Sequence, residues 1–136
     1  QVNATYYSAL GESDEKMLLA RAIQMFMPGK PQIWYLDLFA GKNDHEAVQR
    51  AGESGHKEIN RTNLSVDQIV EGLKKDVVQK QLALIRMRNT HKAFSEGAEV
   101  TISGEESSLE IHWEYDGAYA ELHVNFEEGT YTIESN

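Results

Sequence analysis

The side chains best suited to chemistry gather in one long polar stretch, residues 41–63, which follows a short apolar run at residues 33–36. Lys42-Asn43-Asp44 lies near the start of the stretch and His56-Lys57-Glu58 near its end. A connection of this length is uncommon unless it is functional or disordered. In α/β folds, loops that leave the carboxyl ends of strands build the binding sites. We therefore expect a candidate binding site in this stretch.

Each polar residue here also has a structural interpretation. A carboxylate at the end of a strand can act as an acid, but for Asp37 we favour a hydrogen-bonded structural role. Lys42, Asn43 and Asp44 either shape the loop backbone or touch a ligand, and the sequence leaves both open. Asn60-Arg61 is expected to brace the loop by hydrogen bonds rather than to contact a ligand.

No metal site and no cofactor are predicted from the residue types. His45 and His56 fit no metal-ligand spacing. The chain has no cysteine, so it forms neither a disulfide nor a thiolate zinc site. The remaining histidines are expected on the surface, and they are His91, His112 and His123.

Composition excludes several classes of partner. Of the 136 residues, 40% are hydrophobic and 26% are charged, which is ordinary for one small globular domain. The net charge of −9 argues against nucleic acid or an anionic membrane as partner, because both need a basic face. No apolar run approaches the ~20 residues that cross a bilayer, and the first residues match no signal peptide. We expect a cytoplasmic protein.

The elements expected around the polar stretch are helices and one buried strand. Ser13 is a candidate N-cap for a helix that ends at Pro28-Gly29. Residues 33–36 are predicted to form a strand buried on both faces, with Trp34 in the core. Ser65 begins a capping-box pattern that opens a helical region reaching about residue 93.

The last forty or so residues change character, because β-branched and aromatic residues alternate with polar ones. Asp116-Gly117 is a strong hairpin signal, and Glu127-Glu128-Gly129 marks a second turn. Residues 95–136 are therefore predicted to form a small antiparallel meander with one buried face that includes Trp113. The single strand at residues 33–36 would lack partners for its buried backbone groups. We therefore expect the chain to be a fragment of a longer protein.

Several segments in register carry a resemblance to a known family. They are residues 1–11 (QVNATYYSALG), 20–24 (ARAIQ), 28–33 (PGKPQI), 40–44 (AGKND) and 59–61 (INR). In this order and at these spacings they resemble the C-terminal part of sucrose phosphorylases, a branch of the α-amylase superfamily (glycoside hydrolase family 13). The match covers residues 1–94, and residues 95–136 resemble the family only in kind.

The resemblance implies an α/β plus β fold, namely the C-terminal segment of a (β/α)8 barrel followed by a small antiparallel β-domain. Residues 1–94 would belong to the barrel and residues 95–136 to the β-domain. Within the barrel part, residues 13–27 would form the seventh helix, 32–37 the eighth strand and 38–64 the eighth βα loop. The remainder of the barrel would then be a partner of this chain.

The resemblance also implies a reaction. In this family an α-glucoside is cleaved with retention: an Asp nucleophile forms a glucosyl-enzyme, and inorganic phosphate releases α-glucose 1-phosphate. A nucleophile and an acid/base residue suit such a double displacement. The family's nucleophile, acid/base Glu and stabilising Asp lie upstream of this chain. No residue here is therefore assigned a catalytic role, and the chain alone is expected to be inactive.

Three positions are matched to binding residues of the family. Gln1 matches a glutamine on a mobile acceptor-side loop, where it can hydrogen-bond a sugar hydroxyl. Lys57 falls where sucrose phosphorylases have an arginine that reaches glucose hydroxyls, and lysine lacks the planar fork of donors. The residues around it look more like relatives that act on sucrose 6′-phosphate or glucosylglycerate. Because both acceptors are anionic, His56 or Lys57 is expected to face the negative group.

A stand-alone carbohydrate-binding or interaction module, built on the β-meander, is the alternative function. Such a module requires exposed aromatic side chains on one face of the sheet. Trp113 and Tyr115 instead alternate in one set with Leu109 and Ile111, which favours burial.

Overall fold

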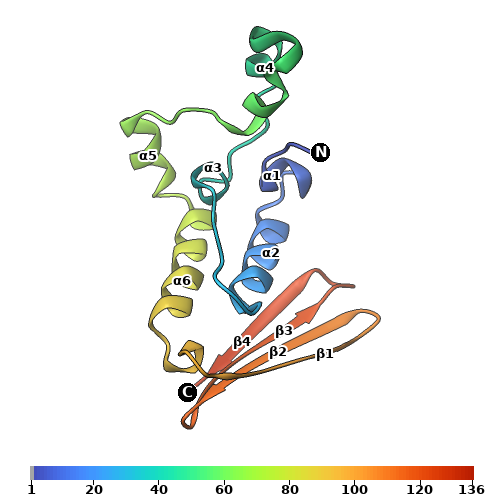
Figure 1. The fold of residues 1–136 in the computed structure, drawn as a ribbon, viewed down its shortest axis with the longest axis vertical. Helices are drawn as coiled ribbons and strands as arrows, with labels where there is room; N and C mark the ends of the chain where they lie inside the picture. The colour runs from blue at the N-terminus through green and yellow to red at the C-terminus, as the bar shows by residue number, and fades with distance from the viewer. Residues whose placement is uncertain (1) are drawn as a thin grey trace. The chain divides into compact units, whose positions relative to one another are not determined.

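The structure is a computed structural model that describes residues 2–136 (Figure 1). Its α-helices are α1 (Tyr6–Ala9), α2 (Asp14–Phe26), α3 (Tyr35–Leu38), α4 (His45–Ala51), α5 (Val66–Gly72) and α6 (Asp76–Thr90). Two 3-10 helices, η1 (Gly52–Asn60) and η2 (Lys92–Phe94), follow α4 and α6 respectively. The strands are β1 (Glu99–Glu105), β2 (Ser108–Tyr115), β3 (Ala118–Asn125) and β4 (Thr130–Ser135).

The chain divides into two compact units. The first comprises the described residues up to Met17 together with Gln32–Lys80. The second comprises Leu18–Pro31 and Gln81–Asn136, and it therefore contains the whole sheet. No helix in the described part of the chain combines the length and the apolar character that crossing a membrane requires.

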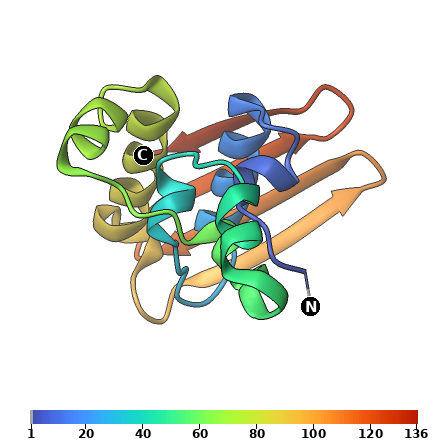
Figure 2. The same cartoon turned by 90° about the horizontal axis from the view of Figure 1, so that it is seen from above.

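The predicted meander is confirmed. The four strands lie in the order β1-β2-β3-β4 and each pairs antiparallel with the next, as both views show (Figures 1 and 2). Ile111 lies opposite Leu122, which lies opposite Ile133. One face carries the buried apolar side chains, because side chains alternate along a strand. The buried members on β2 and β3 are Ile111, Trp113, Ala120, Leu122 and Val124.

Local turn chemistry sets the register of the sheet. Asp116 and Gly117 link β2 to β3 with positive φ angles of 47° and 77°. A two-residue turn with both φ angles positive matches the twist of the strands that it joins. At the next turn, Gly129 has φ of 67° and the Asn125 side chain accepts a hydrogen bond from Glu128 N at 3.0 Å. Both predicted turns are therefore confirmed.

An aromatic cluster forms the centre of the second unit. The rings of Phe26 and Phe94 lie 5.3 Å apart, and those of Phe94 and Trp113 also lie 5.3 Å apart. Trp113 is only 6% exposed, and its indole N–H donates to Phe26 O at 2.6 Å. The prediction of a buried Trp113 is confirmed, and its polar atom has the partner that a buried indole requires.

Arg88 joins this aromatic cluster to the end of α2. Its guanidinium lies 4.3 Å from the Trp113 ring centre. It also donates to Met25 O at 2.7 Å and to Gly29 O at 2.8 Å. Carbonyl groups at the end of a helix lack hydrogen-bond donors within the helix. Arg88 supplies such donors at the end of α2. Burial lowers the pKa of Arg88 from its ordinary value.

The predicted strand at residues 32–37 is wrong. Trp34 is extended, with φ of −73° and ψ of 137°, but Tyr35–Leu38 forms the short helix α3. A strand exists only through hydrogen bonds to neighbouring strands, and every ladder among the described residues lies within β1 to β4. Trp34 is 48% exposed, so its expected place in the core is also wrong. Its indole N–H donates to Asn60 O at 2.8 Å.

The predicted helix starts are confirmed. Ser13 Oγ accepts a hydrogen bond from Lys16 N at 3.2 Å at the start of α2. At the start of α5, Ser65 Oγ accepts from Gln68 N at 3.2 Å, and Gln68 Oε1 accepts from Ser65 N at 2.8 Å. These reciprocal bonds are the capping box, in which two otherwise unpaired backbone donors are satisfied.

Candidate binding loop

The polar stretch expected to be one long loop contains two short helices, α4 and η1. Asp44 caps α4 by accepting from Ala47 N at 2.9 Å. The amide of Asp44 donates to Ile59 O at 2.8 Å and thereby closes the segment near its base. Gly52, with φ of 74°, connects α4 to η1. The stretch is therefore a helical loop whose two ends are joined by a backbone hydrogen bond.

Asn43 fixes the loop to the N-terminal segment. Its Oδ1 accepts from Thr5 N at 2.8 Å, and its own amide donates to Ser8 Oγ at 2.9 Å. Thr5 is fully buried and its hydroxyl caps α1. Of the two interpretations left open for Asn43, the structure supports the one in which it shapes the backbone.

The two other structural interpretations agree with the contacts. Asp37 Oδ1 accepts from Tyr6 N at 2.8 Å, so this carboxylate is hydrogen-bonded, although at the end of α3 and not of a strand. Asn60 Nδ2 lies 3.4 Å from Ala4 O and thereby braces the loop.

Lys42, whose role as a loop residue or a ligand contact the sequence left open, forms an ion pair. Its Nζ lies 2.8 Å from Glu12 Oε2, and both side chains are exposed. The hydrogen bond and the charge of Glu12 raise the pKa of Lys42 above its ordinary value. The ammonium group is thus occupied within the chain.

A hollow of about 490 Å³ opens between α4 and the segment that follows η1. Its charged lining consists of two guanidinium groups, Arg50 and Arg61, and two carboxylates, Asp44 and Glu58. Arg61 Nη1 lies 3.4 Å from Glu58 Oε1. Such mixed donors and acceptors suit a small polyhydroxylated or anionic ligand. The sequence analysis did not identify Arg50, because it belongs to no motif and only the folding of α4 brings it to the hollow.

The predicted substrate-binding residues are placed as follows. His56 and Lys57 are adjacent on η1, and both are exposed. Neither lines the hollow. Within residues 2–136, neither has a side-chain hydrogen bond or ion pair, so their polar ends face solvent. Gln1 lies outside the described residues.

Comparison with known proteins gives a clear relationship. The chain is 51% identical over 133 residues to a sucrose 6(F)-phosphate phosphorylase of Ilumatobacter coccineus, covering 98% of this chain and 25% of the relative. It is 41% identical over 133 residues to a sucrose phosphorylase of Agrobacterium vitis, covering 98% of this chain and 27% of the relative. No protein-family model matches the chain.

The fold comparison agrees. The crystal structure of sucrose 6F-phosphate phosphorylase from Thermoanaerobacter thermosaccharolyticum superposes with a TM-score of 0.92 at 42% identity, over 99% of this chain and 27% of that one. Sequence and fold thus both relate this chain to one class of proteins, the sucrose and sucrose 6(F)-phosphate phosphorylases. The resemblance to sucrose phosphorylases is confirmed, and the chain is homologous to the C-terminal part of these enzymes. It spans about a quarter of the length of the curated relatives that it matches.

Proposed function

We propose that the chain is part of a cytoplasmic retaining phosphorylase that transfers glucose from an α-glucoside to inorganic phosphate, giving α-glucose 1-phosphate. The supporting observation is the similarity over 98% of the chain to relatives that are named as phosphorylases. Residues 1–94 would complete a (β/α)8 barrel with the remainder of the protein, and residues 95–136 would form its β-domain. The catalytic carboxylates would come from that remainder.

The contribution of this chain would be to bind substrate through the loop that carries η1. His56 and Lys57 are exposed and uncommitted in a chain of net charge −9, which makes them well placed to meet an anionic group. The relative at 51% identity is named for a phosphorylated sucrose. We therefore favour sucrose 6′-phosphate over sucrose and glucosylglycerate as the donor, with Gln1 as a further contact to a sugar hydroxyl.

Release of glucose 1-phosphate tests the reaction. The longer parent protein is supplied with phosphate and, in turn, with sucrose, sucrose 6′-phosphate and glucosylglycerate. We expect release to be fastest from sucrose 6′-phosphate, and no release from any donor by residues 1–136 alone. An inactive parent would contradict the proposed reaction. Release by the short chain would contradict the proposed location of the carboxylates.

Substitution in the parent tests the role of the cationic residues. We expect His56→Ala or Lys57→Ala to raise KM for sucrose 6′-phosphate about tenfold, because a charge-assisted contact is lost. For sucrose the change should be smaller if the residue faces the phosphate. Lys16→Ala, at an exposed position of α2, is the matched control and should leave KM unchanged for both donors. Equal changes for both donors would assign the residue to the glucose instead.

The alternative of a stand-alone carbohydrate-binding module is not favoured. It requires an exposed aromatic platform on the sheet. Trp113 is 6% exposed and packs against Phe94, as expected. The expected burial of Tyr115 is wrong, because this side chain at the end of β2 is 36% exposed.

A further inference from the structure

The face of the sheet opposite the core carries a linked row of histidines and glutamates. Ile111 and Leu122 point into the core. Their neighbours in the chain, His112 on β2 and Glu121 on β3, therefore lie on the other face of the sheet. The register places His112 opposite Glu121, and Glu121 opposite Glu134 of β4. Three neighbouring strands therefore contribute to the row.

Glu121 is the centre of this row. Its Oε1 lies 2.6 Å from His123 Nε2, and its Oε2 lies 2.5 Å from His112 Nδ1. The other nitrogen of each ring also faces a carboxylate. His123 Nδ1 lies 3.2 Å from Glu110 Oε1, and His112 Nε2 lies 3.2 Å from Glu114 Oε2.

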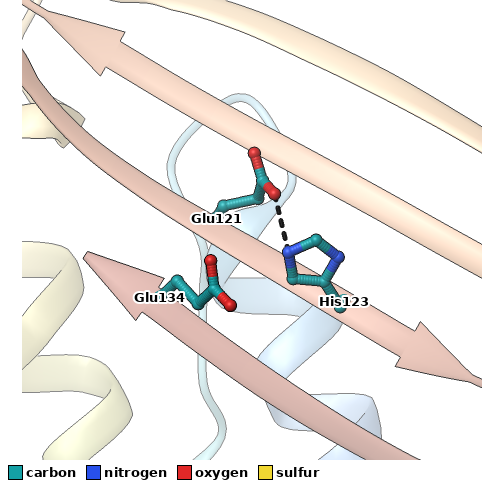
Figure 3. Close-up of side chains that lie close together, drawn as sticks. All are labelled: Glu121, His123 and Glu134. Atoms are coloured by element: carbon teal, nitrogen blue, oxygen red, sulfur yellow. Dashed lines mark ion pairs between the residues drawn. The ribbon is translucent and has the colours of Figure 1, made fainter.

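Three members of the row offer a set of metal ligands. One ligand atom each from Glu121, His123 and Glu134 lies within 4.8 Å of the others, and Figure 3 shows the three side chains close together on β3 and β4. Imidazole nitrogen and carboxylate oxygen bind zinc at about 2.0–2.2 Å. Glu134 is exposed, so its side chain can move toward the other two and leave a further position for water.

The charge of the surrounding region also favours a bound cation. Residues 95–136 contain eleven Asp and Glu residues but no Lys or Arg. The four glutamates of the row exceed the charge that two histidines can neutralise, even when both are protonated. Glu121 and Glu134 also lie directly opposite each other on neighbouring strands. Like charges in this position destabilise a sheet, and a bound cation would reverse that effect.

The surrounding contacts orient the ligands. Metal-binding histidines commonly donate their second ring N–H to a carboxylate, which fixes the tautomer and the ring orientation. Glu110 is in position to do this for Nδ1 of His123, so that Nε2 faces Glu121. His112 similarly holds the second oxygen of Glu121. Two of the three candidate ligands, His123 and Glu121, are therefore held in place by residues outside the ligand set.

We propose that Glu121, His123 and Glu134 bind one divalent transition-metal ion of the Zn²⁺ class. The imidazole ligand selects such an ion over Mg²⁺ or Ca²⁺, which take oxygen ligands. Binding at His123 Nε2 releases to solvent any proton that this nitrogen carries, and it joins β3 to β4 through the metal. Glu110 and His112 are positioning residues. The inference is independent of the proposed function and needs no residue of the loop.

Calorimetric titration of ZnCl₂ into the 136-residue chain, after treatment with EDTA and dialysis, tests the proposal. We expect one saturable site per chain. His123→Gln and Glu134→Gln should each weaken binding at least about tenfold, and Glu110→Ala should weaken it by a similar or smaller factor. The matched controls are exposed residues outside the row, His45→Gln in α4 and Glu127→Gln in the β3–β4 turn, and both should bind as the original chain does.

Two outcomes would overturn the proposal. One is the absence of saturable Zn²⁺ binding by the original chain. The other is equal binding by the original chain and by both the His123→Gln and Glu134→Gln variants, which would indicate diffuse attraction to an acidic surface. Far-UV circular dichroism in EDTA checks that each variant is folded. Co²⁺ in place of Zn²⁺ gives a second readout, because its visible absorption should change when His123 is replaced.

Discussion

The loop at residues 41–63 and the β-sheet hold their polar side chains in different ways. In the loop, single side chains bond to backbone atoms, as Asn43 does with Thr5 and Asp44 with Ala47. In the sheet, the register places partners opposite each other, as with His112 and Glu121. Each loop contact stands by itself, whereas the contacts in the sheet share a framework set by many backbone hydrogen bonds. We therefore expect a substitution in the loop to act locally, and one in the sheet to affect several partners.

The two tryptophans make the contrast measurable. We expect Trp113→Ala to lower the free energy of unfolding by about 3–5 kcal/mol, because it removes a large buried side chain and leaves a cavity. Trp34→Ala, at a 48% exposed position, should change it by about 1 kcal/mol or less. Urea unfolding followed by circular dichroism measures both. Similar losses for the two variants would contradict the difference in packing between Trp34, which bonds to the loop at Asn60 O, and Trp113 in the sheet.

Arg88 tests how much one side chain contributes to the sheet unit. Lysine keeps the charge but cannot bond to Met25 O and Gly29 O together while lying over the Trp113 ring. We expect Arg88→Lys to lower the free energy of unfolding by about 2 kcal/mol. Arg50→Lys, in the exposed pair with Glu46, is the control and should change it by less than about 0.5 kcal/mol. An unchanged urea midpoint for Arg88→Lys would show that its contacts are dispensable.

Asn43 provides the corresponding test in the loop. Asn43→Ala removes the acceptor of the Thr5 amide, and we expect a loss of about 1 kcal/mol. Hydrogen exchange should show faster exchange at the Thr5 amide, with the sheet amides unchanged. The control is Asn63→Ala, at an exposed position. Slower folding or faster exchange throughout the sheet would mean that the loop is not an independent feature.

The smallest expected effect lies in the β2–β3 turn. The hydrogen bond from Lys92 Nζ at 2.6 Å, together with the charge of Lys92, holds the pKa of Asp116 below its ordinary value of 3.8. A carboxylate whose pKa is lowered by folding stabilises the fold at pH values above its ordinary pKa. This contribution is lost as the pH falls through the lowered pKa.

Asp116→Asn separates the turn from the charge. Asparagine tolerates the positive φ of 47° at this position, so the hairpin should persist. We expect thermal melts at pH 2–5 to show a weaker dependence of Tm on pH in the variant than in the original chain. An identical pH dependence would mean that the ion pair with Lys92 contributes nothing in solution.

Sequence reasoning succeeded where the decisive interaction is local. The Asp116-Gly117 turn needs only two residues with positive φ, and the capping box at Ser65 needs only a partner three residues away. Both follow from the order of residues alone. The resemblance to sucrose phosphorylases succeeded for a similar reason, since it rests on short motifs at fixed spacings.

It failed where the decisive interactions join residues that are distant in the sequence, or where no partner is present among the described residues. Residues 33–36 have an apolar and aromatic pattern typical of a buried strand, but no strand in the described part of the chain pairs with them, and Trp34 is exposed. The histidine–glutamate row was missed because Glu134 meets Glu121 only through the register of β3 and β4. The alternation of Glu121 and His123 in a predicted strand was the available signal.

The order of the strands has a consequence for how the sheet forms. Each strand pairs with the one that precedes it in the chain, through turns as short as Asp116-Gly117. A sheet built in this way has a low contact order for a β-structure, because few chain segments must be closed before pairing begins. Single hairpins form in about 1–10 μs. We therefore expect the meander to assemble by successive additions of neighbouring strands, which is a fast route to a sheet.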